Sequence, residues 1–491
     1  MKHDERQVPL EIPADEFRAI GHWLVDEVAA FFESLPARPV TRAETPASIR
    51  PFLPKGPLPA AGMGAMELLR ETAPLLIERS LFNAHPRFLA YVTSPATPIG
   101  VLAELLAAAV NPNVGAGQLS PVATAIELQT VSWIADLIGY PEDCGGLLVS
   151  GGNMANIVGF LAARRARAGW DVRTEGIAAG PELVLYASSE THTWVQKAAD
   201  MAGLGTKAIR FIPVDATLRM DTAALRLEIA ADRAAGRRPF LAVGSAGTVS
   251  TGAVDPLPEI GAICREEGLW FHVDGAYGAL AAALPDASAD LKGLALADSV
   301  AVDPHKWLYA PLEAGCALVR DRQALVDAFS YHPAYYTFDP EATNFYELGP
   351  QNSRGFRALK VWLALRQAGR NGYVRMISDD IGLARELHRA VTAHPELEAV
   401  TQGLSITTFR FVPEDLATGT EKAEEMLNEL NGKLLERLQA SGEAYLSNAV
   451  VDGKFLLRAC VVNFRTTLAD IEAIPGIVAR IGREVYAGMR R

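Results

Sequence analysis

The feature that most constrains the fold is an alternation of short apolar runs with helix-like stretches between residues 140 and 320. The apolar runs have strand length and lie at residues 182–189, 207–214, 239–245, 269–273 and 298–302. Stretches with helical periodicity separate most of them. Because this alternation places helices on both faces of a sheet, it predicts an α/β fold with a mostly parallel central sheet. A last run, at residues 314–320, follows the one before it so closely that we expect it to run the other way.

The segments on either side of this region predict two further parts. Residues 1–84 carry an apolar stripe at helical spacing, from Phe17 to Phe31, followed by a proline-rich connector. Because such an arm cannot form a core alone, we expect it to pack on the rest of the subunit or on a partner subunit. Residues 85–372 would then form a large domain, and residues 373–491 a smaller C-terminal α+β domain.

The last third of the chain mixes helical and strand signals. Long helices are predicted at residues 356–369 and 374–394, and a final helix at residues 468–490. Asp452-Gly453 lies between two apolar runs, and this dipeptide is a strong signal for a two-residue β-hairpin turn. Helices combined with antiparallel hairpins are typical of an α+β domain.

Composition and charge narrow the functional classes. The formal net charge is -12, which disfavours nucleic acid and anionic membranes as partners. The four cysteines include no C-x-x-C pair, so we expect no metal site of that kind. The charged first 17 residues lack a signal-peptide core, and the apolar run at residues 101–110 is too short to span a bilayer. We therefore expect a cytoplasmic protein.

Two polar residues follow neighbouring strands of the predicted sheet, at the edge where ligands bind. Asp274 follows the run at residues 269–273, and Lys306 follows the run at residues 298–302. A carboxylate can keep a pyridine nitrogen protonated, and a lysine can form a Schiff base with an aldehyde. Taken singly, each residue also fits an ordinary role, the first as an acid bound to backbone amides or a metal ion and the second as a solvated lysine.

Three weaker signals belong to the same edge. His192 begins a helix-like stretch just after a predicted strand, where an imidazole could stack on a flat cofactor and transfer protons. Ser150-Gly151-Gly152-Asn153 precedes another helix, whose first N–H groups favour an anion such as phosphate. No P-loop Gly-Lys-Ser/Thr signature follows, so a nucleoside triphosphate is not indicated. Thr248 ends a third strand and could contact the same ligand.

Together these residues resemble those of the group II pyridoxal phosphate (PLP)-dependent amino acid decarboxylases, and most of all the aromatic-L-amino-acid decarboxylases. The resemblance runs from about residue 85 to residue 467. Its most specific parts are His272-Val273-Asp274-Gly275-Ala276-Tyr277, Pro304-His305-Lys306-Trp307 and Phe356-Arg357-Ala358-Leu359-Lys360. The resemblance implies the aspartate-aminotransferase-like PLP fold (fold type I) and a homodimer with its active site at the subunit interface.

The resemblance also assigns roles to residues. PLP is the implied cofactor, with Lys306 as the Schiff-base lysine and Asp274 beside the pyridine nitrogen. His192 would stack on the ring and take part in catalysis, while Ala276 would support the other face of the ring. The remaining cofactor-binding residues would be Gly151, Gly152, Asn153, Thr248 and His305. The implied reaction is decarboxylation of an L-amino acid, preferably aromatic, to its amine and CO₂.

In the resembling family, a tyrosine on a loop returns a proton to Cα. This loop lies within residues 331–349, where Tyr346 is the first candidate and Tyr336 the second, with Tyr335 also open. If Phe345 takes the place of that tyrosine, the resemblance implies oxidative deamination to an aldehyde instead. Four arginines remain open as partners of the substrate carboxylate: Arg354, Arg357, Arg410 and Arg458.

Several alternatives stay open at this point. Within PLP chemistry, the protein could be an aldehyde synthase, an aminotransferase or a decarboxylase of a non-aromatic amino acid. In a different class, it could bind PLP without activity and act by interaction. The absence of a G-x-S-x-G or H-E-x-x-H motif disfavours a serine hydrolase and a zinc peptidase.

Overall fold

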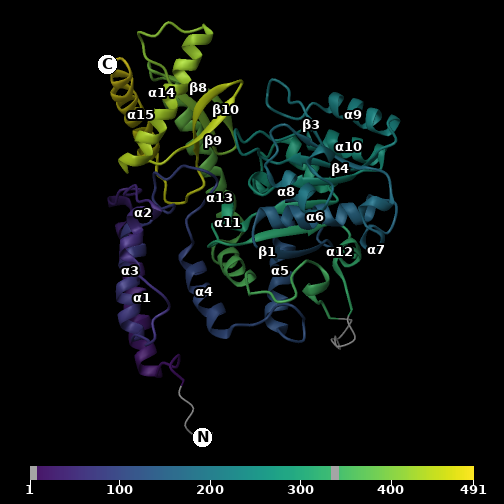
Figure 1. Ribbon diagram of the computed structural model, residues 1–491, viewed down its shortest axis with the longest axis horizontal. Helices are drawn as coiled ribbons and strands as arrows, with labels where there is room; N and C mark the ends of the chain where they lie inside the picture. Colours follow the sequence, from purple (N-terminus) through teal and green to yellow (C-terminus); the bar gives the residue numbers. More distant parts are fainter. Residues whose placement is uncertain (1–7, 333–341) are drawn as a thin grey trace, which may run out of the picture.

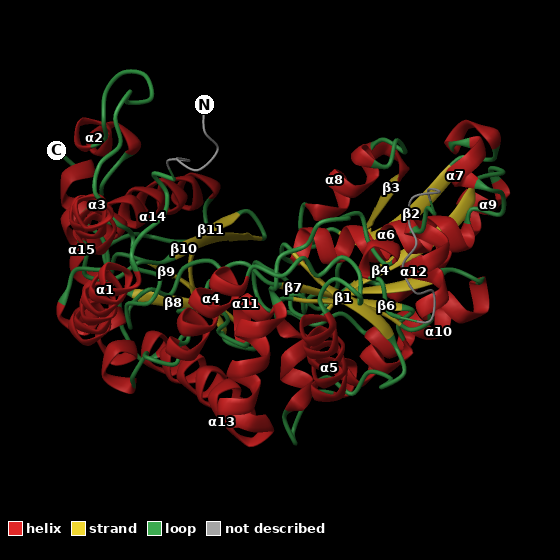
Figure 2. Cartoon of the chain, turned by 90° about the horizontal axis from the view of Figure 1, so that it is seen from below, coloured by secondary structure: helices red, strands yellow, loops and turns green. Residues whose placement is uncertain are grey.

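The computed structural model describes residues 8–332 and 342–491. In these residues, the larger sheet has seven strands in the order β1-β7-β6-β5-β4-β2-β3 (Figures 1 and 2). The strands are β1 (Gly145–Val149), β2 (Leu183–Ser188), β3 (Ile209–Ile212), β4 (Arg238–Ser245), β5 (Trp270–Asp274), β6 (Ser299–Val302) and β7 (Gly315–Val319). Strands β3, β2, β4, β5 and β6 pair in parallel, and β7 is antiparallel to both β6 and β1. The predicted parallel sheet and its reversed strand are confirmed.

The larger sheet is buried on both faces, which explains why its strands read as continuous apolar runs. In β5, Phe271 and Val273 belong to one core cluster. Trp270, on the same strand, belongs to the other. Because successive side chains of a strand point to opposite faces, one strand supplies both cores.

Helices cover each face of this sheet (Figure 2). The first core receives side chains from α5 (Pro121–Leu137), α9 (Thr222–Ala234), α10 (Leu257–Glu267) and α13 (Ala358–Thr392). The second receives them from α6 (Gly152–Arg167), α7 (Val172–Glu175), α8 (Trp194–Met201) and α12 (Arg322–Phe329). The predicted three-layer arrangement follows from the burial of both sheet faces.

A second sheet, of four antiparallel strands among the described residues, has the order β10-β11-β9-β8. Its strands are β8 (Leu397–Gly403), β9 (Ile406–Phe411), β10 (Ser447–Val451) and β11 (Lys454–Cys460). Helices α14 (Glu421–Ser441) and α15 (Leu468–Met489) pack on it to form a third core. Asp452 and Gly453 both have positive φ, 49° and 74°, as a tight hairpin turn requires. The predicted hairpin is confirmed.

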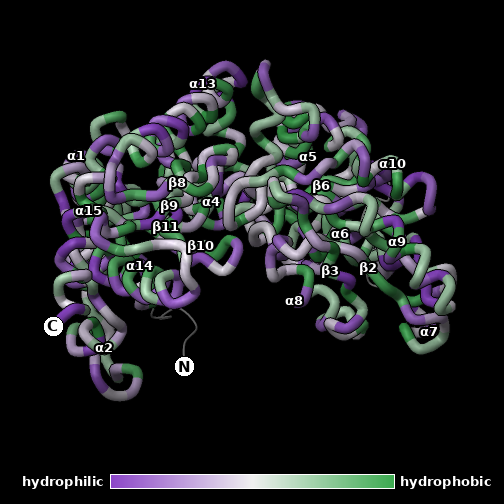
Figure 3. Tube along the Cα trace, turned by 90° about the horizontal axis from the view of Figure 1, so that it is seen from above, coloured by the Kyte–Doolittle hydropathy of each residue, from purple (hydrophilic) through white to green (hydrophobic). Residues whose placement is uncertain are grey.

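Helix α13 joins the two parts of the molecule, and residues 356–369 and 374–394 were predicted as two helices. The structure has two helices that meet at a kink within the run Ala358–Thr392, where the backbone of Gly369 is non-helical (φ 65°, ψ 171°), so the two predicted helices are confirmed. Figure 3 shows hydrophilic and hydrophobic stretches alternating along this run, as expected of a helix with one buried face.

The N-terminal part consists of α1 (Ala14–Ser34), α2 (Pro46–Ile49), α3 (Ala65–Arg79) and α4 (Pro98–Val110) (Figure 1). In the described chain, Ile20 is the one buried residue of α1, and Leu24, Val28 and Phe31 are partly buried, so most of the predicted apolar stripe packs at least in part against other residues. Between α3 and α4, Leu89 donates a backbone hydrogen bond to Tyr445 and accepts one from Cys460, which attaches this segment to the C-terminal part. In residues 8–332 and 342–491, no helix combines the length and the apolarity that crossing a bilayer requires.

Candidate active site

A cavity of about 530 Å³ lies at the carboxyl ends of β4, β5 and β6, beside the first turn of α6. Strands that run in parallel bring the residues after their carboxyl ends to one edge, so side chains far apart in sequence meet there. The cavity is lined by all of the predicted cofactor-binding residues: Gly151, Gly152, Asn153, His192, Thr248, Asp274, Ala276, His305 and Lys306.

Lys306 reaches this cavity from α11 (Pro304–Trp307), a single turn that directly follows β6. Its Nζ lies 3.0 Å from Oδ2 of Asp303, whose side chain is 2% exposed. The carboxylate compensates the charge of the amine at a partly buried position. Sequence reasoning missed Asp303, although this residue follows β6 just as the strand-end signal for Asp274 required.

Asp274 is the last residue of β5. Its Oδ1 accepts a hydrogen bond from the backbone N–H of Ala276 (3.2 Å), and its Oδ2 accepts one from Nε1 of Trp194 (2.8 Å). Both carboxylate oxygens therefore have a donor, and the side chain is held in one orientation. Trp194 was not singled out from the sequence, because an apolar residue at a helix start reads as core.

Two histidines line the same cavity as Lys306. The pKa of His192 is lowered, mainly because the ring is buried. The negative charge of Asp274 opposes this shift, and the positive charge of Lys306 adds to it. Nδ1 of His192 accepts the backbone N–H of Trp194 (3.2 Å), which suits a neutral ring with its proton on Nε2. Burial also lowers the pKa of His305, whose Nδ1 lies 2.6 Å from the carbonyl oxygen of Ala314.

The glycines before α6 are required by close packing. Gly151 has φ of 111°, a conformation that other residues rarely adopt. A Cβ on Gly152 would lie 2.5 Å from Oδ2 of Asp303 and 3.2 Å from Cβ of Ala276. The backbone can therefore approach the cavity closely, and the N–H groups of the 16-residue helix α6 are placed to bind an anion.

Thr248 and Ala276 complete the walls of the cavity. Thr248 is buried, and its Oγ1 lies 3.1 Å from Oγ1 of Thr251. The methyl group of Ala276 is small enough to leave room for a flat ring on that side. Oδ1 of Asp303 is buried without a hydrogen-bond partner, so the cavity still has an unused acceptor.

Of the three candidates for the loop tyrosine, Tyr346 is the one that the structure describes. Tyr346 is buried in a 3₁₀ turn, Phe345–Glu347, and its backbone N–H donates to the carbonyl oxygen of Gly115. It is not one of the residues that line the cavity. Phe345 is also buried, with the Arg354 guanidinium 4.5 Å from its ring centre. The other candidates, Tyr335 and Tyr336, lie outside the described residues, so the identity of the proton donor stays a prediction.

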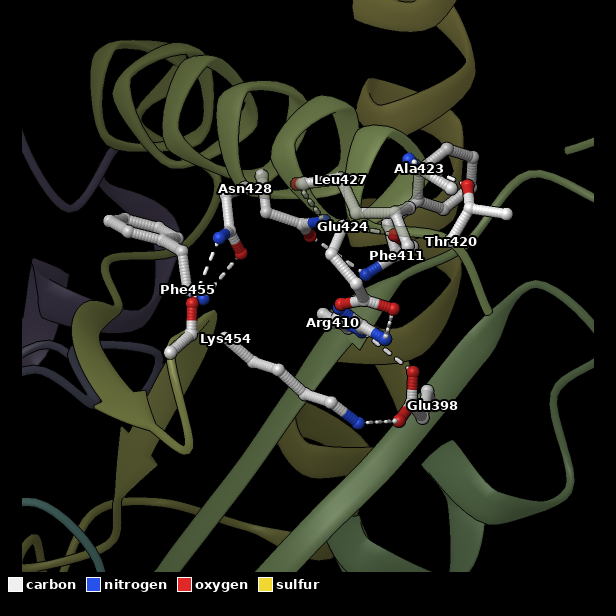
Figure 4. A network of polar contacts seen from close by, with 12 residues as sticks. Glu398, Arg410, Phe411, Thr420, Ala423, Glu424, Leu427, Asn428, Lys454 and Phe455 are labelled. Atoms are coloured by element: carbon white, nitrogen blue, oxygen red, sulfur yellow. Dashed lines mark hydrogen bonds and ion pairs between the residues drawn. The ribbon is translucent and has the colours of Figure 1, made fainter. Parts of the chain in front are cut away.

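Three of the four candidate arginines are paired with acids within the chain. Arg354 pairs with buried Glu127, and Nε of Arg357 lies 2.6 Å from Oε1 of Glu313. Arg410 binds two glutamates of the C-terminal part, one on β8 and one on α14 (Figure 4).

Arg458 differs from the other three. Its Nη1 donates to the carbonyl oxygen of Tyr91 (3.0 Å) and to Oγ of Ser447 (3.1 Å). Its Nε and Nη2 are buried without a partner, and no described acid pairs with it. It is the candidate arginine whose charge remains uncompensated in the described part of the chain.

The cavity offers one partner for each reactive part of PLP: an amine for the aldehyde, a carboxylate for the pyridine nitrogen, a flat space for the ring and a helix N-terminus for the phosphate. The lack of room for a side chain at Gly152 and the unpaired Oδ1 of Asp303 are consistent with a ligand of this kind. The fold and this site together define a PLP-dependent enzyme of fold type I.

Comparisons with known proteins narrow the class. The pyridoxal-dependent decarboxylase conserved domain matches residues 63–412, and the chain belongs to that family. An aromatic-L-amino-acid decarboxylase from Bacillus atrophaeus is 35% identical and covers 97% of both chains. A phenylacetaldehyde synthase from a Rosa hybrid cultivar is 29% identical, over 93% of this chain and 91% of its own. The crystal structure of Oryza sativa TDC with PLP and tryptamine matches with a TM-score of 0.89 at 28% identity, covering 98% and 99% of the two chains.

Proposed function

We propose that this decarboxylase acts on an aromatic L-amino acid and releases the corresponding amine and CO₂, with PLP attached to Lys306. The observation that carries the proposal is the single cavity that contains Lys306, Asp274, His192 and the first turn of α6. Bound PLP supplies an electron sink for the charge that develops at Cα when CO₂ leaves. The names of the similar decarboxylases and of the solved TDC complex support an aromatic substrate.

Each residue would contribute a distinct interaction. The carboxylate of Asp274 would hold a proton on the pyridine nitrogen, because a neighbouring anion favours the protonated form. The neutral imidazole of His192 would lie against the ring. The N–H groups at the start of α6 would hold the phosphate. Lys306, whose charge Asp303 balances, would provide the attachment point.

Aldehyde formation is a second candidate. The similarity to phenylacetaldehyde synthases favours it. An enzyme without a tyrosine at the reacting carbon has no such donor to return a proton to Cα. The two functions differ in their reactants and products, since decarboxylation with oxidative deamination consumes O₂ and water and yields an aldehyde, CO₂, ammonia and hydrogen peroxide.

A homodimer is part of the proposal. Helix α4 exposes a row of large apolar side chains, each more than half exposed: Leu102, Leu105, Leu106 and Val110. Phe17 on α1 is 59% exposed, and it lines a groove of about 990 Å³ together with Leu105. Leu312, at the cavity itself, is 63% exposed. Exposed apolar surface of this extent marks an interaction site, and a second copy of the chain would cover it beside the cavity.

The attachment to Lys306 is tested with the Lys306→Ala variant. We expect purified wild-type protein to show an absorption band near the edge of the visible range, from the Schiff base, and the variant to lose both this band and activity. The measurement is the absorption spectrum after incubation with PLP and removal of the unbound cofactor. Lys197→Ala, which removes another lysine that lines the cavity, should keep the band. A band that survives unchanged in Lys306→Ala would contradict the assignment.

The reaction and the substrate are tested by supplying each proteinogenic amino acid to the PLP-loaded enzyme and measuring CO₂, amine, aldehyde and hydrogen peroxide. We expect amine and CO₂ from tyrosine, tryptophan or phenylalanine. Aldehyde with hydrogen peroxide would select the second candidate. Turnover of glutamate or of an aliphatic amino acid alone would overturn the aromatic assignment.

A further inference from the structure

We infer that Trp194 is a positioning residue: its indole orients Asp274 toward the cofactor, and its backbone N–H contacts His192. The inference rests on the proposed function, because it assigns Trp194 a role through the two residues expected to contact PLP. It concerns a side chain that neither touches the reacting atoms nor lines the cavity in this structure.

Trp194 is the first residue of α8 and is completely buried. Its indole N–H donates to Oδ2 of Asp274 over 2.8 Å, and its backbone N–H donates to Nδ1 of His192 over 3.2 Å. One residue thus contacts the carboxylate expected at the pyridine nitrogen and the imidazole expected against the ring face. Its two donors restrict how both side chains rotate.

The chemistry of the donor suits this role. An indole N–H donates and cannot accept, and it carries no charge. A lysine or arginine at this position would form an ion pair with Asp274 and compete with a protonated pyridine nitrogen for the carboxylate. A neutral donor fixes the orientation of Asp274 and leaves its negative charge available.

The indole of Trp194 packs against a buried hydrogen-bonded network of His272, Asn156 and Ser299. The ring of Trp194 packs edge-to-face on His272, with ring centres 5.5 Å apart. His272 is buried, and its Nε2 and Nδ1 each lie 2.7 Å from a partner, Oδ1 of Asn156 and Oγ of Ser299.

The protons of this network have one consistent arrangement. Asn156 donates its amide to the carbonyl oxygen of Gly152, so its Oδ1 must accept from Nε2–H of His272. Ser299 accepts from Nε1 of Trp270 and can donate to Nδ1 of His272. Burial lowers the pKa of His272 to about 4, so the ring is neutral near pH 7. The support under Trp194 is therefore rigid and uncharged.

The test compares Trp194→Phe with Trp170→Phe. The first removes the N–H and keeps a ring to pack on His272. The control also removes one indole hydrogen bond, but one to the carbonyl oxygen of Gly176 at an exposed position outside the cavity. We expect Trp194→Phe to bind PLP about tenfold more weakly and to lower kcat about tenfold, the effect of losing one hydrogen bond to a charged group, while KM changes less than about twofold. Trp170→Phe should match the wild type in all three.

A double-mutant cycle separates positioning from general packing. If Trp194 acts on the cofactor mainly through Asp274, Trp194→Phe should weaken PLP binding much less in an Asp274→Ala background than in the wild-type background. A packing defect would produce the same loss in both. If Trp194→Phe does not fold, benzothienylalanine incorporated at position 194 provides the same shape with sulfur in place of the N–H, and we expect the same loss of PLP affinity from it.

The outcomes distinguish this inference from the proposed function. Wild-type protein that binds no PLP would overturn the proposed function. Wild-type protein that binds PLP while Trp194→Phe behaves like Trp170→Phe would overturn the inference alone. An effect of equal size in the Asp274→Ala background would do the same.

Discussion

At the scale of single residues, the site depends on positions where no side chain fits. Gly159 lies in α6 opposite β5 and β6. A Cβ on Gly159 would lie 2.7 Å from Nδ1 of His272 and 2.9 Å from Oγ of Ser299. Both atoms belong to the buried network that packs against Trp194. This network fits beside α6 only because residue 159 has no side chain.

Gly159→Ala should destabilise the protein by about 1–3 kcal/mol, because the added methyl group must displace buried and hydrogen-bonded neighbours. Gly382→Ala is the matched control, since a Cβ on this α13 residue would meet nothing within 4 Å. The free energy of unfolding of this control variant should stay the same or rise by up to about 1 kcal/mol, because alanine has a better helix propensity than glycine. Midpoints of urea unfolding of the apoprotein measure both, and equal midpoints for the two variants would contradict the prediction.

At the scale of elements, α13 ties the lysine-bearing turn α11 to the rest of the molecule. Asp380 on α13 is buried, and its Oδ2 accepts hydrogen bonds from Nε1 of Trp307 and from the hydroxyl of Tyr309, both over 2.8 Å. Trp307 immediately follows Lys306. The backbone position of Lys306 is therefore set partly by a helix more than 70 residues further along the chain.

Burial raises the pKa of Asp380 to about 7, so we expect the stability of the folded protein to depend on pH. The folded protein then keeps a proton that the unfolded chain has released, so this group's contribution to the free energy of unfolding falls as pH rises from about 4 to 7. Asp380→Asn removes that titration. As pH rises through this range, the free energy of unfolding of the variant should increase relative to that of the wild type by up to about 4 kcal/mol. Above this range the difference between the two proteins should change little.

The measurement is urea unfolding of both proteins at several pH values between 4 and 8. Asp286→Asn, at an exposed position, serves as the control and should leave the difference from the wild type constant with pH. A constant difference for Asp380→Asn as well would show that Asp380 does not hold a proton in the folded protein.

At the scale of the whole molecule, the exposed apolar face of α4 is the feature that a single chain leaves unexplained. The groove between α1 and α4 brings together apolar side chains of the N-terminal arm and Leu105 of α4. Burying such a face in a homodimer would stabilise the protein through the hydrophobic effect. It would also place a second chain near the rim of the active site.

We expect a Leu105→Arg, Leu106→Arg double variant to sediment as a monomer at micromolar concentration and to lose most activity, because charged side chains cannot be buried in an apolar interface without partners. Leu227→Arg on α9 is the control, since Leu227 is 74% exposed and lies on another part of the surface. This control should keep the mass and activity of the wild type. A wild-type protein that sediments as a monomer would contradict the proposal.

Much of the fold was predictable because its signals are local. Strand length, helical periodicity and a hairpin turn such as Asp452-Gly453 depend on residues close together in the chain. The two helices predicted around Gly369 are confirmed as well, because the positive φ that glycine adopts at low cost allows the break between them.

The place of the site was predictable from the sequence, because residues that follow parallel strands must share one edge of the sheet. Asp274, His192 and Lys306 could be placed there from strand ends alone. Which side chains hold these residues depends on tertiary packing: Asp303 contacts Lys306, and Trp194 contacts Asp274. The tertiary structure also pairs the other three candidate arginines with acids and gives Arg458 none among the described residues. These partners come from separate elements, and their meeting depends on how the elements pack, which local sequence patterns do not encode.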